Sequence, residues 1–167
     1  MSPVYQSVLL IGVATFVAPL SGGEFAQTTI DFAPQVTSAL EHQYGSAEEA
    51  RLRTAILEAV SRETAHIAMP PGLTVTVLLE EVAPTRPTRE QLSTDPALDI
   101  TATKYIGGAA LMGTVRDSGQ QVVATTKYRY FPLTLALGSA SRDPWADARL
   151  AIDQFAVKLA AACPRTH

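Results

Sequence analysis

The amino-acid sequence predicts an α+β domain in which two long helices pack on one face of a mostly antiparallel sheet of four or five strands. Three observations predict this class. Apolar residues recur at helical spacing in segments 46–67 and 143–164, so each helix has one apolar stripe to bury on a flat surface. Residues 73–82 alternate between apolar and polar side chains, as expected for a strand with one buried face. Strand-like segments then follow one another from 98 to 131, which indicates a meander.

Length and composition indicate a single globular domain and give no sign of nucleic-acid binding. The chain has 167 residues, enough for one domain with a proper core. Its 47% hydrophobic and 17% charged residues are typical of a globular protein, because disordered chains contain fewer apolar residues. The formal net charge of −3 gives no reason to expect a nucleic-acid partner, which normally requires a concentrated basic face.

The N-terminal segment predicts export. Residues 7–20, SVLLIGVATFVAPL, form an uncharged apolar run, and every charged side chain lies after Gly23. The run is shorter than the ~20 residues of a membrane span but matches a signal-peptide core, although no Lys or Arg precedes it. We therefore expect a signal peptide at 1–23, a mature chain that begins between about Ser21 and Thr28, and a single domain at 24–167. The alternative is a buried strand or helix of the fold itself.

The position of the single cysteine bears on whether the exported chain carries a lipid anchor. The only cysteine, Cys163, cannot form an internal disulfide, and no cysteine follows the apolar run to accept a lipid. We expect a soluble periplasmic or secreted protein without a stable membrane anchor once the leader is removed.

Two helices are expected in the N-terminal half, after a strand at 27–32, QTTIDF. The first covers 34–44, with Pro34 in its first turn and Gly45 as its stop. The second covers 46–67 and has the spacing of a capping box between Ser46 and Glu49. Its apolar stripe consists of Leu52, Ile56, Ala59, Val60 and Ile67.

The middle of the chain is expected to contain a strand, a long loop and a second strand. The strand at 73–82 alternates Leu, Val, Val and Leu against threonines. Prolines at 84, 87 and 96 block regular pairing, so 83–97 is expected to be an extended loop. Residues 98–106, LDITATKYI, resume strand character and lead into the next segment.

Residues 105–131 are expected to form a hairpin that turns at Asp117-Ser118-Gly119. The glycines match neither a dinucleotide motif nor a P-loop, and the apolar run of ~11 residues is too short for a membrane. A two-residue loop pairs Gly107 with Tyr130, whereas a three-residue loop pairs Gly108 with Tyr128. In both registers a glycine lies opposite a tyrosine, and the glycines are expected to serve close packing. The two-residue loop also leaves three basic side chains together on the solvated face: Arg116, Lys127 and Arg129.

The C-terminal helix is expected at 143–164, with Asp143 as its cap, Pro144 in its first position and Pro164 after its end. Its apolar stripe consists of Trp145, Ala148, Ile152, Phe155, Leu159 and Cys163. Trp145 and Cys163 are therefore expected in the core rather than at a site.

The sequence contains no recognisable catalytic or metal-binding spacing. The histidines, at 42, 66 and 167, form no metal motif, and no nucleophile elbow is present. Cys163 on a core stripe lacks the exposed, electropositive surroundings of a nucleophile. We expect no catalytic residues, no metal and no cofactor, and the enzyme class stays open but disfavoured.

Four basic residues are the candidates for binding a partner. Arg86 and Arg89 lie in PTRPTR, where prolines hold the chain extended and arginine forks suit carboxylates or phosphates. Lys127 and Arg129 on the hairpin are secondary candidates. The alternative for the loop is a polar crossover that is neutralised by nearby acidic residues. The expected function is an exported, non-catalytic cell-envelope domain that binds a protein partner or envelope component. The alternative is a small hydrolase or small-molecule-binding protein.

Three stretches also carry a resemblance, which covers residues 28 to 162: GGAALMG, DSG and the terminal WADARLAIDQFA. Together with the leader they resemble a group of small, uncharacterised bacterial cell-envelope proteins, many of them lipoprotein-like. The resemblance implies an N-terminal and a C-terminal helix packed on an antiparallel sheet built around a long hairpin. It implies no activity, and the lipoprotein cysteine of that group is missing here.

Overall fold

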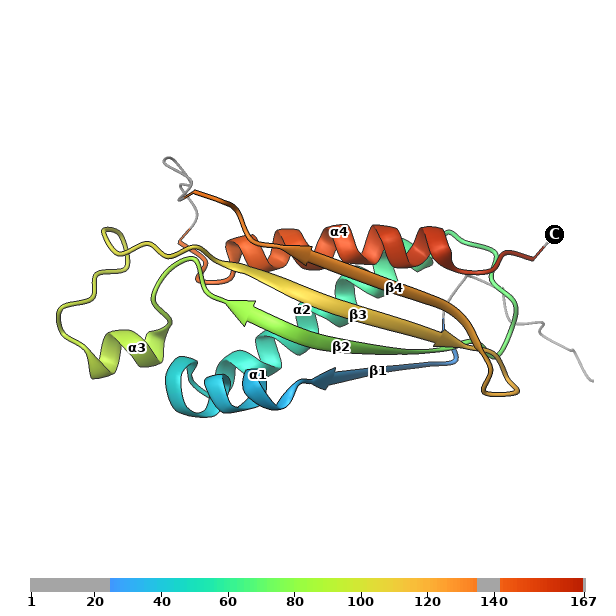
Figure 1. Ribbon diagram of the computed structural model, residues 1–167, viewed down its shortest axis with the longest axis horizontal. Coiled ribbons are helices and arrows are strands. Elements are labelled where there is room, and N and C mark those ends of the chain that lie inside the picture. The colour runs from blue at the N-terminus through green and yellow to red at the C-terminus, as the bar shows by residue number, and fades with distance from the viewer. Residues whose placement is uncertain (1–24, 135–141, 167) are drawn as a thin grey trace, which may run out of the picture.

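The computed structural model describes residues 25–134 and 142–166, and these form a four-stranded sheet with helices on one face (Figure 1). The predicted α+β class is confirmed. The strands lie in the order β1-β2-β3-β4, with bounds Gln27–Phe32, Thr74–Ala83, Gly108–Arg116 and Val122–Tyr130. The predicted signal peptide lies outside the described residues.

The sheet is mixed: two of its three strand pairs are antiparallel, in line with the expected mostly antiparallel sheet, and the pair at the β1 end is parallel. β1 and β2 run parallel, with Ile30 opposite Val77, whereas the β2–β3 and β3–β4 pairs are antiparallel. The connection between β1 and β2 contains α1 and α2, which carry the chain back along the sheet before β2 begins. A returning crossover of this kind gives parallel neighbours.

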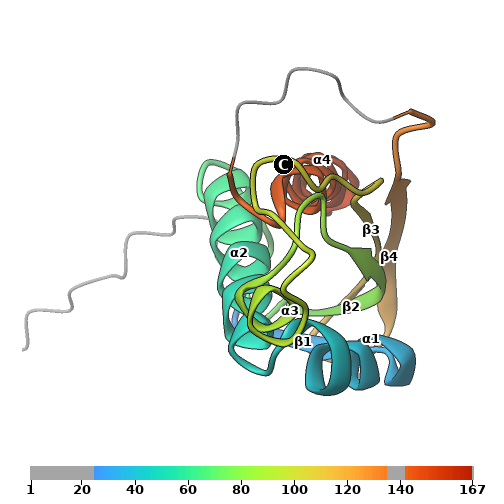
Figure 2. The ribbon, with the colours of Figure 1, turned by 90° about the vertical axis from the view of Figure 1, so that its left-hand side faces the viewer.

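Two long helices cover one face of this sheet. α2 (Ala47–Thr64) and α4 (Ala146–Ala162) pack against each other, and α4 lies on β3 and β4 (Figure 2). Their facing side chains and the inward residues of the strands form one core, including the fully buried Trp145 and Phe155. No helix in the described part of the chain is both long and apolar enough to cross a membrane.

The first helix was predicted correctly at 34–44, but its second half is unusual. α1 (Pro34–Ala39) continues directly into one π-helical segment, η1 (Leu40–Tyr44). Gly45 has a φ of 100°, a left-handed value that favours glycine, and the helix ends there as predicted. Val36 and Leu40 are buried, so this short helix closes the core at the end of β1.

The capping box predicted for α2 is wrong. Ser46 has helical backbone angles of φ −62° and ψ −26°, and its side chain makes no capping hydrogen bond. A capping box occurs instead at α3 (Arg89–Thr94), where the Thr88 side chain accepts from the Gln91 N–H and the Gln91 side chain accepts from the Thr88 N–H. The predicted extended loop at 83–97 therefore contains a helix.

The segment after α3 corrects two further expectations. Residues 98–106 form turns and irregular structure rather than a strand, and β3 begins only at Gly108. Asp99 accepts hydrogen bonds from the Thr101 side chain and from the N–H groups of Thr101 and Ala102. These bonds, led by that of the Thr101 hydroxyl, lower the pKa of Asp99. A side chain that satisfies the backbone locally competes with strand pairing.

The hairpin was predicted, but both of its proposed registers are wrong. Ala109 lies opposite Tyr130 and Leu111 opposite Tyr128, because the turn spans Asp117 to Gln121 and the register shifts between Val115 and Arg116. Within this turn the left-handed residue is Gln120, with φ 64°, rather than Gly119. The Asp117 carboxylate accepts from the Gln121 N–H and stabilises this longer turn.

The glycines serve close packing, as predicted, but not under tyrosines. Gly113 lies opposite Thr126, and a Cβ at position 113 would come within 2.9 Å of both Leu159 Cδ1 and Phe155 Cζ in α4. Gly113 therefore lets α4 approach the sheet closely.

The predicted C-terminal helix begins later than expected, at Ala146. Just before the helix, the Asp143 carboxylate accepts a hydrogen bond from the Trp145 N–H.

Candidate functional site

The helices α2 and α4 leave the other face of the sheet uncovered, and Figure 1 looks onto this open face. Alternation along β2 places Val75, Val77 and Leu79 inward, each at most 1% exposed, and leaves the intervening side chains half-buried on the other side. The strand registers then define this open face as three rows: Thr29, Thr76, Thr114 and Thr125; Asp31, Leu78, Met112 and Lys127; Glu81, Ala110 and Arg129.

The first row consists of threonines only. Thr29 pairs with Thr76, Thr76 with Thr114, and Thr114 with Thr125, so one threonine from each strand forms a continuous line across the sheet. Neighbouring side chains in such a line lie about 5 Å apart. The threonine row therefore presents only short, β-branched side chains.

The second row has opposite charges at its two ends. Asp31 on β1 and Lys127 on β4 are exposed, and Leu78 and Met112 lie half-buried between them. Neither charged side chain makes a hydrogen bond or ion pair with another described residue. The row is thus an apolar strip with one unpaired acid and one unpaired base.

The third row contains an internal ion pair. Arg129 Nη2 lies 2.9 Å from the Glu81 carboxylate, and the Arg129 guanidinium also lies over the Phe131 ring, 4.5 Å from its centroid. These contacts hold the Arg129 side chain along the sheet although it is exposed, and Lys127 beside it is exposed as well. The structure thus brings two of the four predicted binding residues, Lys127 and Arg129, onto the open face.

Arg86 is not on a surface, and the expectation that it is exposed is wrong. Its side chain is 6% exposed, and Nη1 donates to the carbonyls of Ile100 and Thr101 at 2.9 and 3.0 Å. The neighbouring Thr85 bonds through its backbone to Pro144 and Tyr105, so this segment is a junction between the 98–106 loop and the start of α4. Arg86 lies there because a guanidinium can satisfy several carbonyls at once.

Arg89 is the first residue of α3 and is exposed. It does not lie on the open face of the sheet. It lines a hollow of about 160 Å³ beside the start of α2, together with Tyr44, Glu48, Arg51 and Glu90. Burial raises the pKa of the Tyr44 hydroxyl. The four predicted binding residues are therefore divided among three places.

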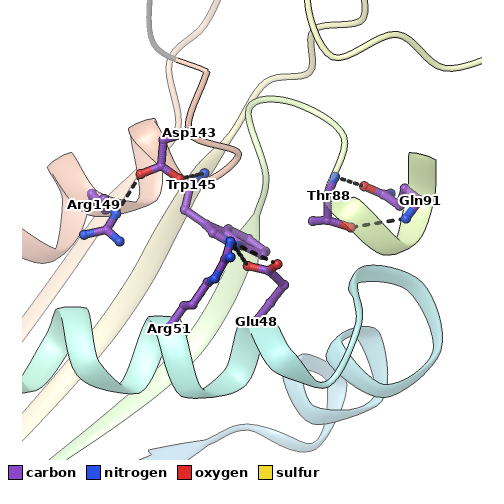
Figure 3. Close-up of polar contacts among 7 residues, drawn as sticks. All are labelled: Glu48, Arg51, Thr88, Gln91, Asp143, Trp145 and Arg149. Atoms are coloured by element: carbon purple, nitrogen blue, oxygen red, sulfur yellow. Dashed lines mark hydrogen bonds and ion pairs between the residues drawn. The ribbon is translucent and has the colours of Figure 1, made fainter. Parts of the chain in front are cut away.

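The wall of this hollow contains a buried polar cluster that the sequence did not reveal. The Glu48 side chain, 4% exposed, accepts a hydrogen bond of 2.7 Å from Trp145 Nε1 (Figure 3). Arg51 Nη1 lies 3.4 Å from the same carboxylate, and the Tyr44 ring meets the indole edge-on at a centroid distance of 5.5 Å. Glu48 is thus satisfied by its neighbours and ties α2 to the start of α4.

The titratable side chains of the described residues offer no metal site or activated thiol. The described residues contain no group of three or more His, Cys, Asp or Glu side chains that could hold a metal ion. His42 Nε2 lies 3.9 Å from Glu41, but both side chains are more than half exposed. Cys163 is buried, as predicted, and burial raises the pKa of its thiol to about 11.

No family model, curated protein or solved structure gives a significant match to this chain. The open face and the Glu48 cluster are the two candidate sites of the described residues. Of the two, the cluster is internally satisfied, whereas the open face exposes unpaired charges and half-buried apolar side chains.

Proposed function

We propose that this chain is an exported, non-catalytic domain of the cell envelope that binds a protein partner through the open face of its sheet. The observation that carries this proposal is the second row of that face, in which Leu78 and Met112 are flanked by the unpaired Asp31 and Lys127. Apolar side chains at the centre with charges at the rim form the usual anatomy of a protein interface. Export is supported by the uncharged apolar segment at 7–20.

The basic side of the open face gives a direct test. The double variant Lys127→Glu/Arg129→Glu reverses two exposed charges on β4. A matched control, Arg142→Glu/Arg165→Glu, makes the same change in net charge at two exposed arginines outside the sheet. We expect the sheet variant to lose a partner that wild type and control both capture from an envelope extract of the native host.

Thermal unfolding provides the reference for this comparison. Surface ion pairs contribute about 0–1 kcal/mol, so the sheet variant should unfold within a few degrees of wild type although its Arg129–Glu81 pair is lost. Equal capture by all three proteins would refute the open face as the binding surface. Export is tested separately by mass spectrometry of the native protein, for which an intact Met1 on a cytosolic chain is the contrary result.

A further inference from the structure

We propose that the partner bound by the open face is a second copy of this chain, packed face to face so that Asp31 of each copy contacts Lys127 of the other. This inference rests on the proposed function and specifies its partner. The second row of the open face carries opposite charges that cannot meet within one molecule.

The spacing of strands explains why they cannot meet. Asp31 lies on β1 and Lys127 on β4, at the two outer strands of the sheet. Three strand spacings of about 4.8 Å separate their Cα atoms by about 14 Å. Both side chains are exposed, and Leu78 and Met112 lie between them. Exposed charges this far apart are largely screened at physiological salt, so neither stabilises the other within the monomer.

A two-fold axis parallel to the strands brings these charges together. Such an axis exchanges β1 with β4 and β2 with β3 between two facing sheets, because the strand order is β1-β2-β3-β4. Asp31 then lies over Lys127 of the other copy, and Leu78 over Met112, in both halves of the interface. An axis perpendicular to the strands would place acid over acid and base over base. The charges therefore select the first arrangement.

The threonine row makes this close approach possible. Under the same axis Thr29 faces Thr125, and Thr76 faces Thr114, so the row packs on itself. Short β-branched side chains leave no long group to hold the sheets apart, and facing sheets pack about 10 Å from each other. Threonine hydroxyls can also bond across the interface, which keeps them satisfied when water is removed.

The size of the face sets the expected strength. Four strands and the three rows span an area that buries on the order of 1,000 Å² in total between two copies, close to the lower limit of specific interfaces. We therefore expect a concentration-dependent dimer rather than an obligate one.

Sedimentation velocity of the mature chain across the micromolar to millimolar range tests the inference. Wild type should shift from monomer to dimer as concentration rises. Asp31→Lys alone and Lys127→Asp alone should each weaken the dimer at least about tenfold, because both symmetric pairs become repulsive. The double variant Asp31→Lys/Lys127→Asp should dimerise again, since both pairs are then opposite in charge.

Mixing provides the sharpest form of the test. At concentrations where each single variant alone is monomeric, the two should form a mixed dimer with each other, because all four facing groups are then complementary. Together with renewed dimerisation of the double variant, this result requires position 31 to meet position 127, because an interface that placed each position over itself would leave the double variant repulsive. A mixture that stays monomeric, or single variants that dimerise as well as wild type, would overturn the inference. Thermal melts of every variant confirm that the exposed substitutions leave the fold intact.

The result also separates this inference from the proposed function. If wild type is monomeric throughout but its capture of another envelope protein is lost in Lys127→Glu/Arg129→Glu, the face binds a different partner and only the inference fails. If wild type neither dimerises nor captures a partner through this face, both fail.

Discussion

The indole N–H of Trp145 donates a hydrogen bond of 2.7 Å to the carboxylate of Glu48, which lies 97 residues earlier in the chain. Both side chains are almost fully buried. The bond joins the first turn of α2 to the residue that precedes α4, and these are the two helices that cover the sheet. A buried carboxylate is tolerated only where donors satisfy it, and here Trp145 and Arg51 supply them.

Removal of the Trp145 side chain should strongly destabilise the fold. Trp145→Ala leaves a cavity in the core and is expected to lower the free energy of unfolding by about 3–5 kcal/mol. Trp145→Phe keeps an aromatic ring but removes the donor to Glu48, which should cost about 1–3 kcal/mol. Urea unfolding followed by circular dichroism measures both. A loss below about 0.5 kcal/mol for Trp145→Phe, as at a surface site, would mean that the bond to Glu48 is unimportant.

Replacing Arg86 should lower the stability of the fold much more than replacing Arg89. Arg86 is buried and bonds to two carbonyls of the 98–106 loop, so Arg86→Ala should cost about 2 kcal/mol or more. Arg89→Ala, in the same PTRPTR segment but exposed, should change stability by less than about 0.5 kcal/mol. The pair of variants is compared by thermal unfolding. Equal and small effects would show that the Arg86 bonds contribute nothing to the fold.

Gly113 should not accept a larger residue. In Gly113→Ala the added Cβ would clash with Leu159 and Phe155 of α4, and such overpacking typically costs about 1–3 kcal/mol. Thr114→Ala, one residue later on the open face, is the matched control and should cost less than about 1 kcal/mol, because it introduces no clash with α4. If Gly113→Ala is as stable as wild type, α4 does not pack as closely on β3 as the structure shows.

Cys163 gives a prediction for the dependence of stability on pH. Burial raises the pKa of the thiol to about 11 in the folded protein, above its ordinary value of 9.0. The folded state therefore holds the proton more tightly, so the associated stability is complete below about pH 9 and is lost as pH rises towards 11. Cys163→Ala removes this contribution, and its stability should fall less between these pH values. A parallel fall in both proteins would contradict the assigned burial.

Local patterns predicted much of this fold because they depend on neighbouring residues. The helical stripes of α2 and α4, the alternation of β2 and the glycine stop at Gly45 all act within a few residues, and each was found. The capping box predicted at Ser46 was wrong because Ser46 already has helical backbone angles after Gly45, and its side chain makes no capping hydrogen bond. In 98–106, Asp99 bonds to its own backbone neighbours, which strand propensity does not measure.

The candidate site could be predicted only in part, because it is defined by registers between distant strands. Lys127 and Arg129 were identifiable as exposed basic residues on a hairpin. Asp31 was not, because it becomes the counterpart of Lys127 only when β1 pairs in parallel with β2. The burial of Arg86 likewise depends on the 98–106 loop folding over it. Proline content alone predicted an extended, exposed segment there.

A photo-crosslinking residue at one threonine on each face of the molecule tests the central claim most directly. Thr125 lies on the open face and Thr54 on the outer side of α2, and both are exposed. With the crosslinker at Thr125, irradiation of cells of the native host should give a covalent adduct, whereas the crosslinker at Thr54 should give none. Adducts formed at Thr54 and absent at Thr125 would contradict the assignment of the open face as the binding surface.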